Sequence, residues 1–124
     1  MRSVTMAILL TIGITIFAQP ADEQRRTVIT LMRAINTAEH AVRSRAGRFV
    51  HLAELLEHPA MGGLKADIAV NGSVATHRGA TIRLALSTDA TQYQVAIVPG
   101  ETCDWAAFSD ERGLIYTGKV LDCK

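Results

Sequence analysis

A stripe of apolar residues at helical spacing most constrains what this sequence can fold into. Between residues 22 and 46, apolar positions recur at alternating intervals of three and four, which places them on one face of a long α-helix. The core face of this helix comprises Val28, Leu31, Ile35, Ala38 and Val42. A helix with one apolar face has to bury it against another layer of structure. We therefore expect the rest of the chain to supply that layer.

The remaining positions of this helix are polar or basic. They are Arg25, Arg26, Arg33, Asn36, His40 and Arg43, which lie off the stripe or at its margin. We interpret them as a solvated outer face. Gly47 is expected to end the helix. Arg43 and Arg45 agree with this end, because basic residues in the last turn suit the negative end of the helix dipole.

After the long helix the pattern of apolar residues changes twice. The segment HLAELLEHP, residues 51–59, predicts a short helix of about two turns that Pro59 limits. Beyond Pro59, short runs alternate apolar and polar residues, which is typical of strands with one buried face. The second half of the chain is therefore predicted to be a sheet.

Three hairpins are expected in this sheet. Asn71 and Gly72 stand between two β-prone segments, and both central residues of a type I′ turn need positive φ. The other two hairpins pair 81–87 with 92–99 and 106–110 with 114–118. The predicted fold class is α+β: a long N-terminal helix packed on a small antiparallel β-sheet.

The first residues have the composition of a signal peptide. An uncharged apolar run from Val4 to Ala18 follows the basic Arg2 and precedes a polar stretch with Pro20. The run of about 15 residues is shorter than the roughly 18 to 20 that span a bilayer. We expect residues 1–18 to be a cleaved export signal, with an uncleaved membrane anchor as the alternative. Residues 19–124 then form a single domain.

The charge balance points to no partner class, whereas the cysteine usage agrees with an exported domain. The 124 residues contain 13 Lys and Arg against 12 Asp and Glu, a balance that does not favour nucleic acid as a partner. Membrane contact is expected only if the N-terminal segment is retained. The two cysteines, Cys103 and Cys123, are expected to form one disulfide, which would stabilise the fold by about 3 kcal/mol.

No combination of residues points to a catalytic or metal centre. The four histidines, which are absent from HExxH, HxH and CxxH patterns, are His40, His51, His58 and His77. We interpret them as surface histidines rather than metal ligands. The sequence also lacks GxSxG, P-loop and GxGxxG motifs. A non-enzymatic protein without catalytic residues or cofactor is therefore expected.

Two charged groups leave a binding role open. Four carboxylates lie near the cysteines in the sequence: Asp104, Asp110, Glu111 and Asp122. They are of the residue type that binds calcium, but they do not have the spacing of a calcium-binding motif. Solvated loop carboxylates are the simpler interpretation. Three arginines, Arg43, Arg45 and Arg48, surround the helix end and could bind an anion. The alternative function is accordingly a small periplasmic binding module for an ion or an anionic ligand.

Parts of the sequence are similar to type IV pilin-like proteins and to the major pseudopilins of type II secretion. In these families a leucine-rich helix with an R-x-I-N-T-A run leads to a glycine and aromatic stop, followed by L-x-x-L. The matching residues are Arg33, Ile35, Asn36, Thr37, Ala38, Gly47, Phe49, Leu52 and Leu55. The segment AAFSDERGLIYTG resembles the closing hairpin of these proteins, so that the likeness covers about residues 27–58 and 81–123.

The resemblance implies a helical spine laid on a small antiparallel sheet, a C-terminal disulfide, and export to the periplasm or surface of a bacterium. It also implies partners among pilin or secretion-system components. The N-terminus departs from the family, because it has neither the Gly-Phe-like processing site of prepilins nor a glutamate five residues beyond it. Assembly through a processed membrane helix is therefore not part of the expectation.

Overall fold

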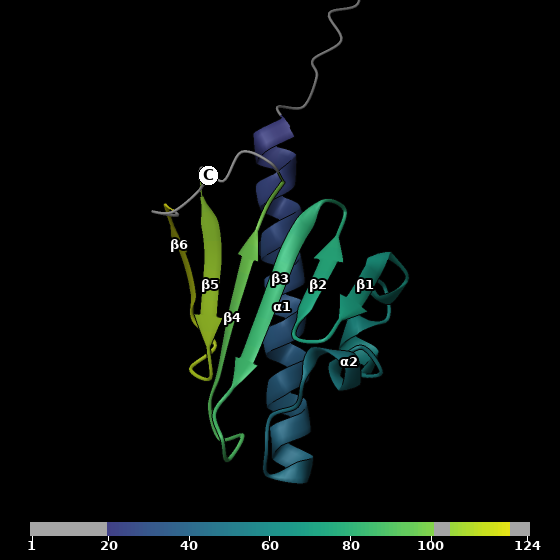
Figure 1. Ribbon diagram of the computed structural model, residues 1–124, viewed down its shortest axis with the longest axis vertical. Helices are drawn as coiled ribbons and strands as arrows, with labels where there is room; N and C mark the ends of the chain where they lie inside the picture. Colours follow the sequence, from purple (N-terminus) through teal and green to yellow (C-terminus); the bar gives the residue numbers. More distant parts are fainter. Residues whose placement is uncertain (1–19, 101–104, 120–124) are drawn as a thin grey trace, which may run out of the picture.

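One long helix packs against a six-stranded antiparallel sheet in the computed structural model, which describes residues 20–100 and 105–119 (Figure 1). The helix is α1, Pro20–Ala46, and the strands are β1 (Ile68–Asn71), β2 (Val74–His77), β3 (Ala80–Leu86), β4 (Tyr93–Val98), β5 (Ala106–Asp110) and β6 (Ile115–Gly118). Each strand pairs with the next along the chain, so that the sheet is a simple meander. The expected α+β class is confirmed.

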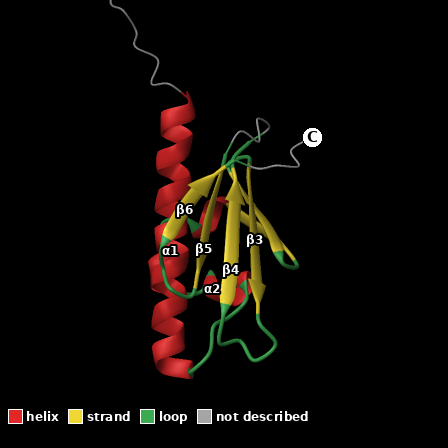
Figure 2. Ribbon diagram, turned by 90° about the vertical axis from the view of Figure 1, so that its left-hand side faces the viewer, coloured by secondary structure: helices red, strands yellow, loops and turns green. Residues whose placement is uncertain are grey.

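Helix α1 uses its apolar stripe to cover one face of the sheet. Val28, Leu31, Ile35 and Ala38 are each at most 1% exposed, and Val42 is half-buried against the same core. Figure 2 shows α1 lying along one side of the sheet and extending past the strands at both ends. The helix ends at Gly47, whose φ of +74° is a conformation that glycine adopts without steric cost.

The segment after α1 is more irregular than the sequence predicts. Helix α2, Leu52–Leu55, has only one turn and is followed by two short 3₁₀ turns, η1 (Pro59–Met61) and η2 (Lys65–Asp67). The Nδ1 atom of His58 accepts a hydrogen bond from the Ala60 N–H at 3.1 Å and so caps η1. The predicted helix over 51–59 is thus shortened, because the chain turns again at Pro59.

The β1–β2 turn lies one residue away from its predicted position, and the hairpin that follows it is absent from the prediction. Asn71 pairs with Val74, so that the β1–β2 turn is centred on Gly72 and Ser73, one residue later than expected. Two successive residues with positive φ occur instead between β2 and β3, at Arg78 (+46°) and Gly79 (+84°). This hairpin was not predicted. The third and fourth strands, and the fifth and sixth, pair as expected.

Only one face of the sheet is covered by the described residues. The inner face packs its buried side chains on α1, α2 and η1, and these are Ala75, Ile82, Leu84, Val95, Ile97 and Ala107. Figures 1 and 2 show no helix on the opposite face within the described ranges. We call this second surface the open face.

Several predicted features lie outside the described residues. They are the signal segment 1–18, both cysteines, Cys103 and Cys123, and the carboxylates of Asp104 and Asp122. Among residues 20–100 and 105–119, no helix combines the length and apolar character needed to cross a membrane.

Candidate interaction surface

Two rows of side chains make up the centre of the open face. Successive residues of a strand point to opposite sides of a sheet, and the antiparallel register aligns the outward residues of neighbouring strands. The first row runs across five strands and consists of Val74, Arg83, Ala96, Phe108 and Tyr116. The second row consists of Ala85, Gln94 and Asp110.

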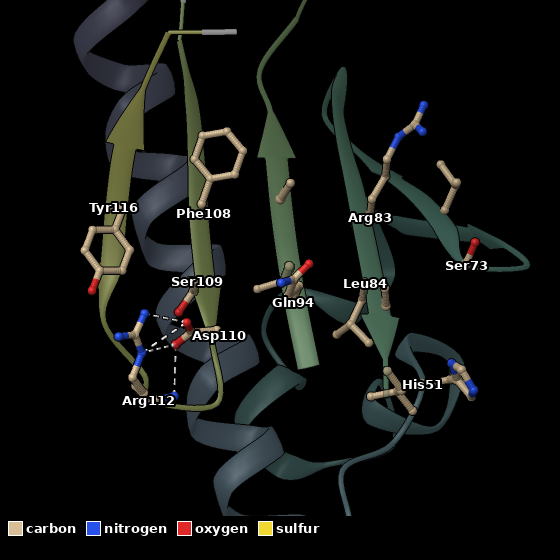
Figure 3. A pocket seen from close by; sticks show the side chains of 15 residues that line it. His51, Ser73, Arg83, Leu84, Gln94, Phe108, Ser109, Asp110, Arg112 and Tyr116 are labelled. Atoms are coloured by element: carbon tan, nitrogen blue, oxygen red, sulfur yellow. Dashed lines mark hydrogen bonds and ion pairs between the residues drawn. The ribbon is translucent and has the colours of Figure 1, made fainter. Parts of the chain in front are cut away.

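A hollow of about 820 Å³ lies over these rows. Ala85 and Ala96, on the two central strands, line this hollow with small side chains that leave space above the sheet. Figure 3 shows Phe108 and Arg83 on opposite sides of β4, with Tyr116 beyond Phe108. Phe108 is 39% exposed and Tyr116 is 46% exposed. Large aromatic side chains that gather around a hollow are typical of surfaces that bind a partner.

The two arginines of the hollow have different environments. The Arg112 guanidinium donates to the Asp110 carboxylate through Nη2 at 2.8 Å and through Nε at 3.1 Å. These bonds lower the pKa of Asp110, so that the pair keeps its opposite charges. Arg83 is exposed and makes no ion pair or hydrogen bond with any other described residue. The lining therefore has an uncompensated positive charge at Arg83.

A buried chain of hydrogen bonds holds β5 in place beneath this surface. The Tyr93 hydroxyl donates to Oδ1 of Asn36, and Nδ2 of Asn36 donates to Oγ of Ser109 at 2.8 Å. Oγ of Ser109 in turn donates to the Leu114 carbonyl at 2.7 Å. Ser109 is thereby anchored toward the core, and its neighbour Phe108 points outward. The interpretation of Asn36 as a solvated residue is wrong, because it is only 7% exposed.

Glu39 and His77 are titratable groups that are buried on the core side of the sheet, away from the hollow. Oε2 of Glu39 accepts a hydrogen bond from the Val50 N–H at 3.0 Å, whereas Oε1 has no partner among the described residues. Burial raises the pKa of Glu39 to about 7. His77 is 1% exposed, and burial lowers its pKa. His77 is therefore not a surface histidine, contrary to the sequence prediction.

The other three histidines have different environments. His40 is exposed, but its ring contacts Phe49 edge-on with the centroids 5.9 Å apart. His51 is exposed at the edge of the hollow, and His58 caps η1. Within the described ranges, no group of three or more His, Cys, Asp or Glu residues is arranged to hold a metal ion.

Of the three arginines at the end of α1, Arg43 makes contacts within the domain. Nη1 of Arg43 donates to the Thr91 carbonyl at 2.7 Å, and its guanidinium lies 4.9 Å from the centroid of the Phe49 ring. Arg45 and Arg48 are exposed. Arg43 thus ties α1 to the β3–β4 loop, which favours a structural role over anion binding for this residue.

The open face was not predicted from the sequence, although the sequence contains a signal for it. In the strand TIRLALS, the apolar Ile82 and Leu84 alternate with Arg83 and Ala85. This alternation shows that Arg83 faces away from the core, but it does not show which residues of other strands stand beside it. The comparisons with known protein families, with curated proteins and with solved structures found no match for this chain.

Proposed function

We propose that this chain is a non-enzymatic, exported, pilin-like protein that binds other proteins through the open face of its sheet. Its place would be that of an accessory to a type IV pilus or type II secretion-like system. The observation that carries the proposal is the one-sided sheet: α1 covers one face, and Phe108 and Tyr116 are exposed around a hollow on the other. Covering exposed apolar surface of this kind with a partner is favourable, because it removes that surface from water.

The pilin-like part of the proposal is supported by the order of elements. A long helix precedes an antiparallel sheet in the chain and packs along it, which is the arrangement that the resemblance implies. Two residues of the resemblance also have structural roles here, since Asn36 is central to the buried hydrogen bonds and Gly47 ends the helix. The proposal includes a disulfide between Cys103 and Cys123 that would link the start of β5 to the segment after β6.

Fractionation and photo-crosslinking in the native host test this function. A photoreactive residue at Gln94, on the open face, should form adducts in the periplasmic or surface fraction, and the mature chain should begin near Gln19. The matched control places the photoreactive residue at Thr88, an exposed position in the β3–β4 loop away from the two rows. Substituting Ala96→Trp should fill the hollow and abolish the Gln94 adducts. Cytosolic retention of the full chain without Gln94 adducts would contradict the proposal.

The volume of the hollow supports a second candidate function, that of a small binding module for an anionic ligand. Small-molecule sites usually have volumes of about 300 to 1,000 Å³. This hollow of about 820 Å³ contains Arg83, which makes no ion pair with another described residue. Calorimetric titration with calcium and with polyphosphate distinguishes the candidates. The protein-binding function predicts no heat from either, whereas heat from polyphosphate that Arg83→Gln removes would favour the second candidate.

A further inference from the structure

The charges of the open face indicate the chemistry of the partner. Asp110 neutralises Arg112 within the hollow, whereas Arg83 has no acidic neighbour among the described residues. A partner that covered Arg83 without supplying an anion would remove water from an unpaired guanidinium, which is unfavourable. A partner that supplied a carboxylate would turn the same contact into a charge-assisted hydrogen bond. Charge complementarity therefore favours a partner segment with an acidic residue.

The geometry of the first row indicates where the apolar part of that segment lies. Arg83 and Phe108 flank Ala96, each one strand away, so that their Cα atoms are about 10 Å apart. A side chain seated over Ala96 would contact the Phe108 ring. In an extended segment, residues two apart project to the same side and are about 7 Å from each other. A carboxylate two residues from the seated side chain is therefore within reach of Arg83.

We propose that the open face binds an extended protein segment that presents an apolar side chain and, two residues away, a carboxylate. The apolar side chain lies over Ala96 against Phe108, and the carboxylate pairs with the guanidinium of Arg83. This inference rests on the proposed function, because it names the partner of the same surface.

The charges of α1 argue against its outer face as the occupant in a second copy of the chain. Among the described side chains of α1, four exposed basic residues, Arg25, Arg26, Arg33 and Arg45, outnumber the exposed acidic residue Glu23. Docking this face on the hollow would place like charges beside Arg83, which opposes association. An acidic segment has the complementary charge.

Titration of the ¹⁵N-labelled protein with short peptides tests the inference. The probe is Gly-Ser-Phe-Ser-Glu-Ser-Gly, and the controls replace its Glu with Lys or its Phe with Ala. The Glu peptide should shift amide signals of β3, β4 and β5, and both control peptides should bind at least about fivefold more weakly. Substituting Arg83→Gln should weaken binding of the Glu peptide about fivefold, and Arg83→Glu should reverse the preference in favour of the Lys peptide.

Equal binding of the Glu and Lys peptides, or a preference unaffected by Arg83→Glu, would overturn the inference. Spectra of each variant without peptide establish that it is folded. The photo-crosslinking assay separates this outcome from failure of the proposed function. Gln94 adducts that are lost in Ala96→Trp but kept in Arg83→Glu mean that the open face binds a protein without needing its acid. Adducts that persist in both variants mean that the open face is not the interface.

Discussion

The hydroxyl of Tyr93 donates a hydrogen bond to the side-chain oxygen of Asn36, which lies 57 residues earlier in the chain. This bond joins the middle of α1 to β4 inside the core. Burial and the nearby carboxylates of Glu39 and Asp110 raise the pKa of Tyr93, so that the hydroxyl keeps its proton and stays a donor. Because Asn36 also donates to Ser109, a single helix residue aligns two strands of the sheet.

Substituting Asn36→Ala should destabilise the domain by about 1 to 3 kcal/mol. The change leaves the Tyr93 hydroxyl and the Ser109 hydroxyl without their helix partner in a buried environment. Urea unfolding followed by circular dichroism measures the loss, and Thr37→Ala, at an exposed position of the same helix, should change stability little. A double-mutant cycle with Tyr93→Phe should show coupling between the two sites. Additive losses would mean that their hydrogen bond contributes nothing measurable.

Glu39 should make the stability of the domain depend on pH. Its pKa is about 7 in the folded protein, above the value of 4.5 for a free carboxyl, so that the folded state holds its proton more tightly than the unfolded state. Stability from this group is fully present below pH 4.5 and is lost as the pH rises to about 7, by about 3 kcal/mol at most.

Urea unfolding at several pH values between 4.5 and 8 measures this dependence. In Glu39→Gln the side chain cannot ionise, and the decline of stability over that range should largely disappear. Glu57→Gln, which removes an exposed carboxylate paired with Lys65, should keep the decline. A wild-type curve that stays flat between pH 4.5 and 7 would contradict the proposed ionisation of Glu39.

Substituting Ile35→Asp should unfold the domain, because Ile35 is 0% exposed and a carboxylate there would have no partner. Thr30→Asp, at an exposed position of α1, should leave the domain folded. His40→Ala should cost at most about 1 kcal/mol, which corresponds to the edge contacts of its ring with Phe49 and Tyr93. Thermal melts compare the three variants, and similar melting of Ile35→Asp and His40→Ala would refute the packing of α1.

Substituting Gly79→Ala should destabilise the β2–β3 hairpin by about 1 to 2 kcal/mol. Gly79 has a φ of +84°, and a Cβ there would meet no other atom within 4 Å, so that the cost comes from the backbone alone. Gly63 offers a matched control, since its Cβ would also meet nothing within 4 Å and its φ is not positive. Gly63→Ala should be neutral or slightly stabilising in thermal melts. Equal effects at the two glycines would exclude backbone strain as the cause.

Local periodicity was sufficient to predict most elements of the fold. The interval of three and four around Ile35 predicts α1, and the alternation in residues 81–87 predicts β3 to within one residue of its bounds. These predictions succeed because helix and strand geometry each impose a fixed spacing on the side chains that are buried. The β2–β3 hairpin was missed, since Arg78 in a left-handed conformation has no clear composition signal.

The sequence by itself therefore determined the α+β class and the apolar residues of α1 that face the core. Only the tertiary structure decided that Asn36 is buried and that Arg83 stands on the open face without an ion-pair partner among the described residues. The physical reason is the same for both residues. A polar side chain can be buried only when partners satisfy it, and a charge is compensated only when an opposite charge lies beside it. The neighbours of these two residues come from other elements of the chain, and the fold brings them together.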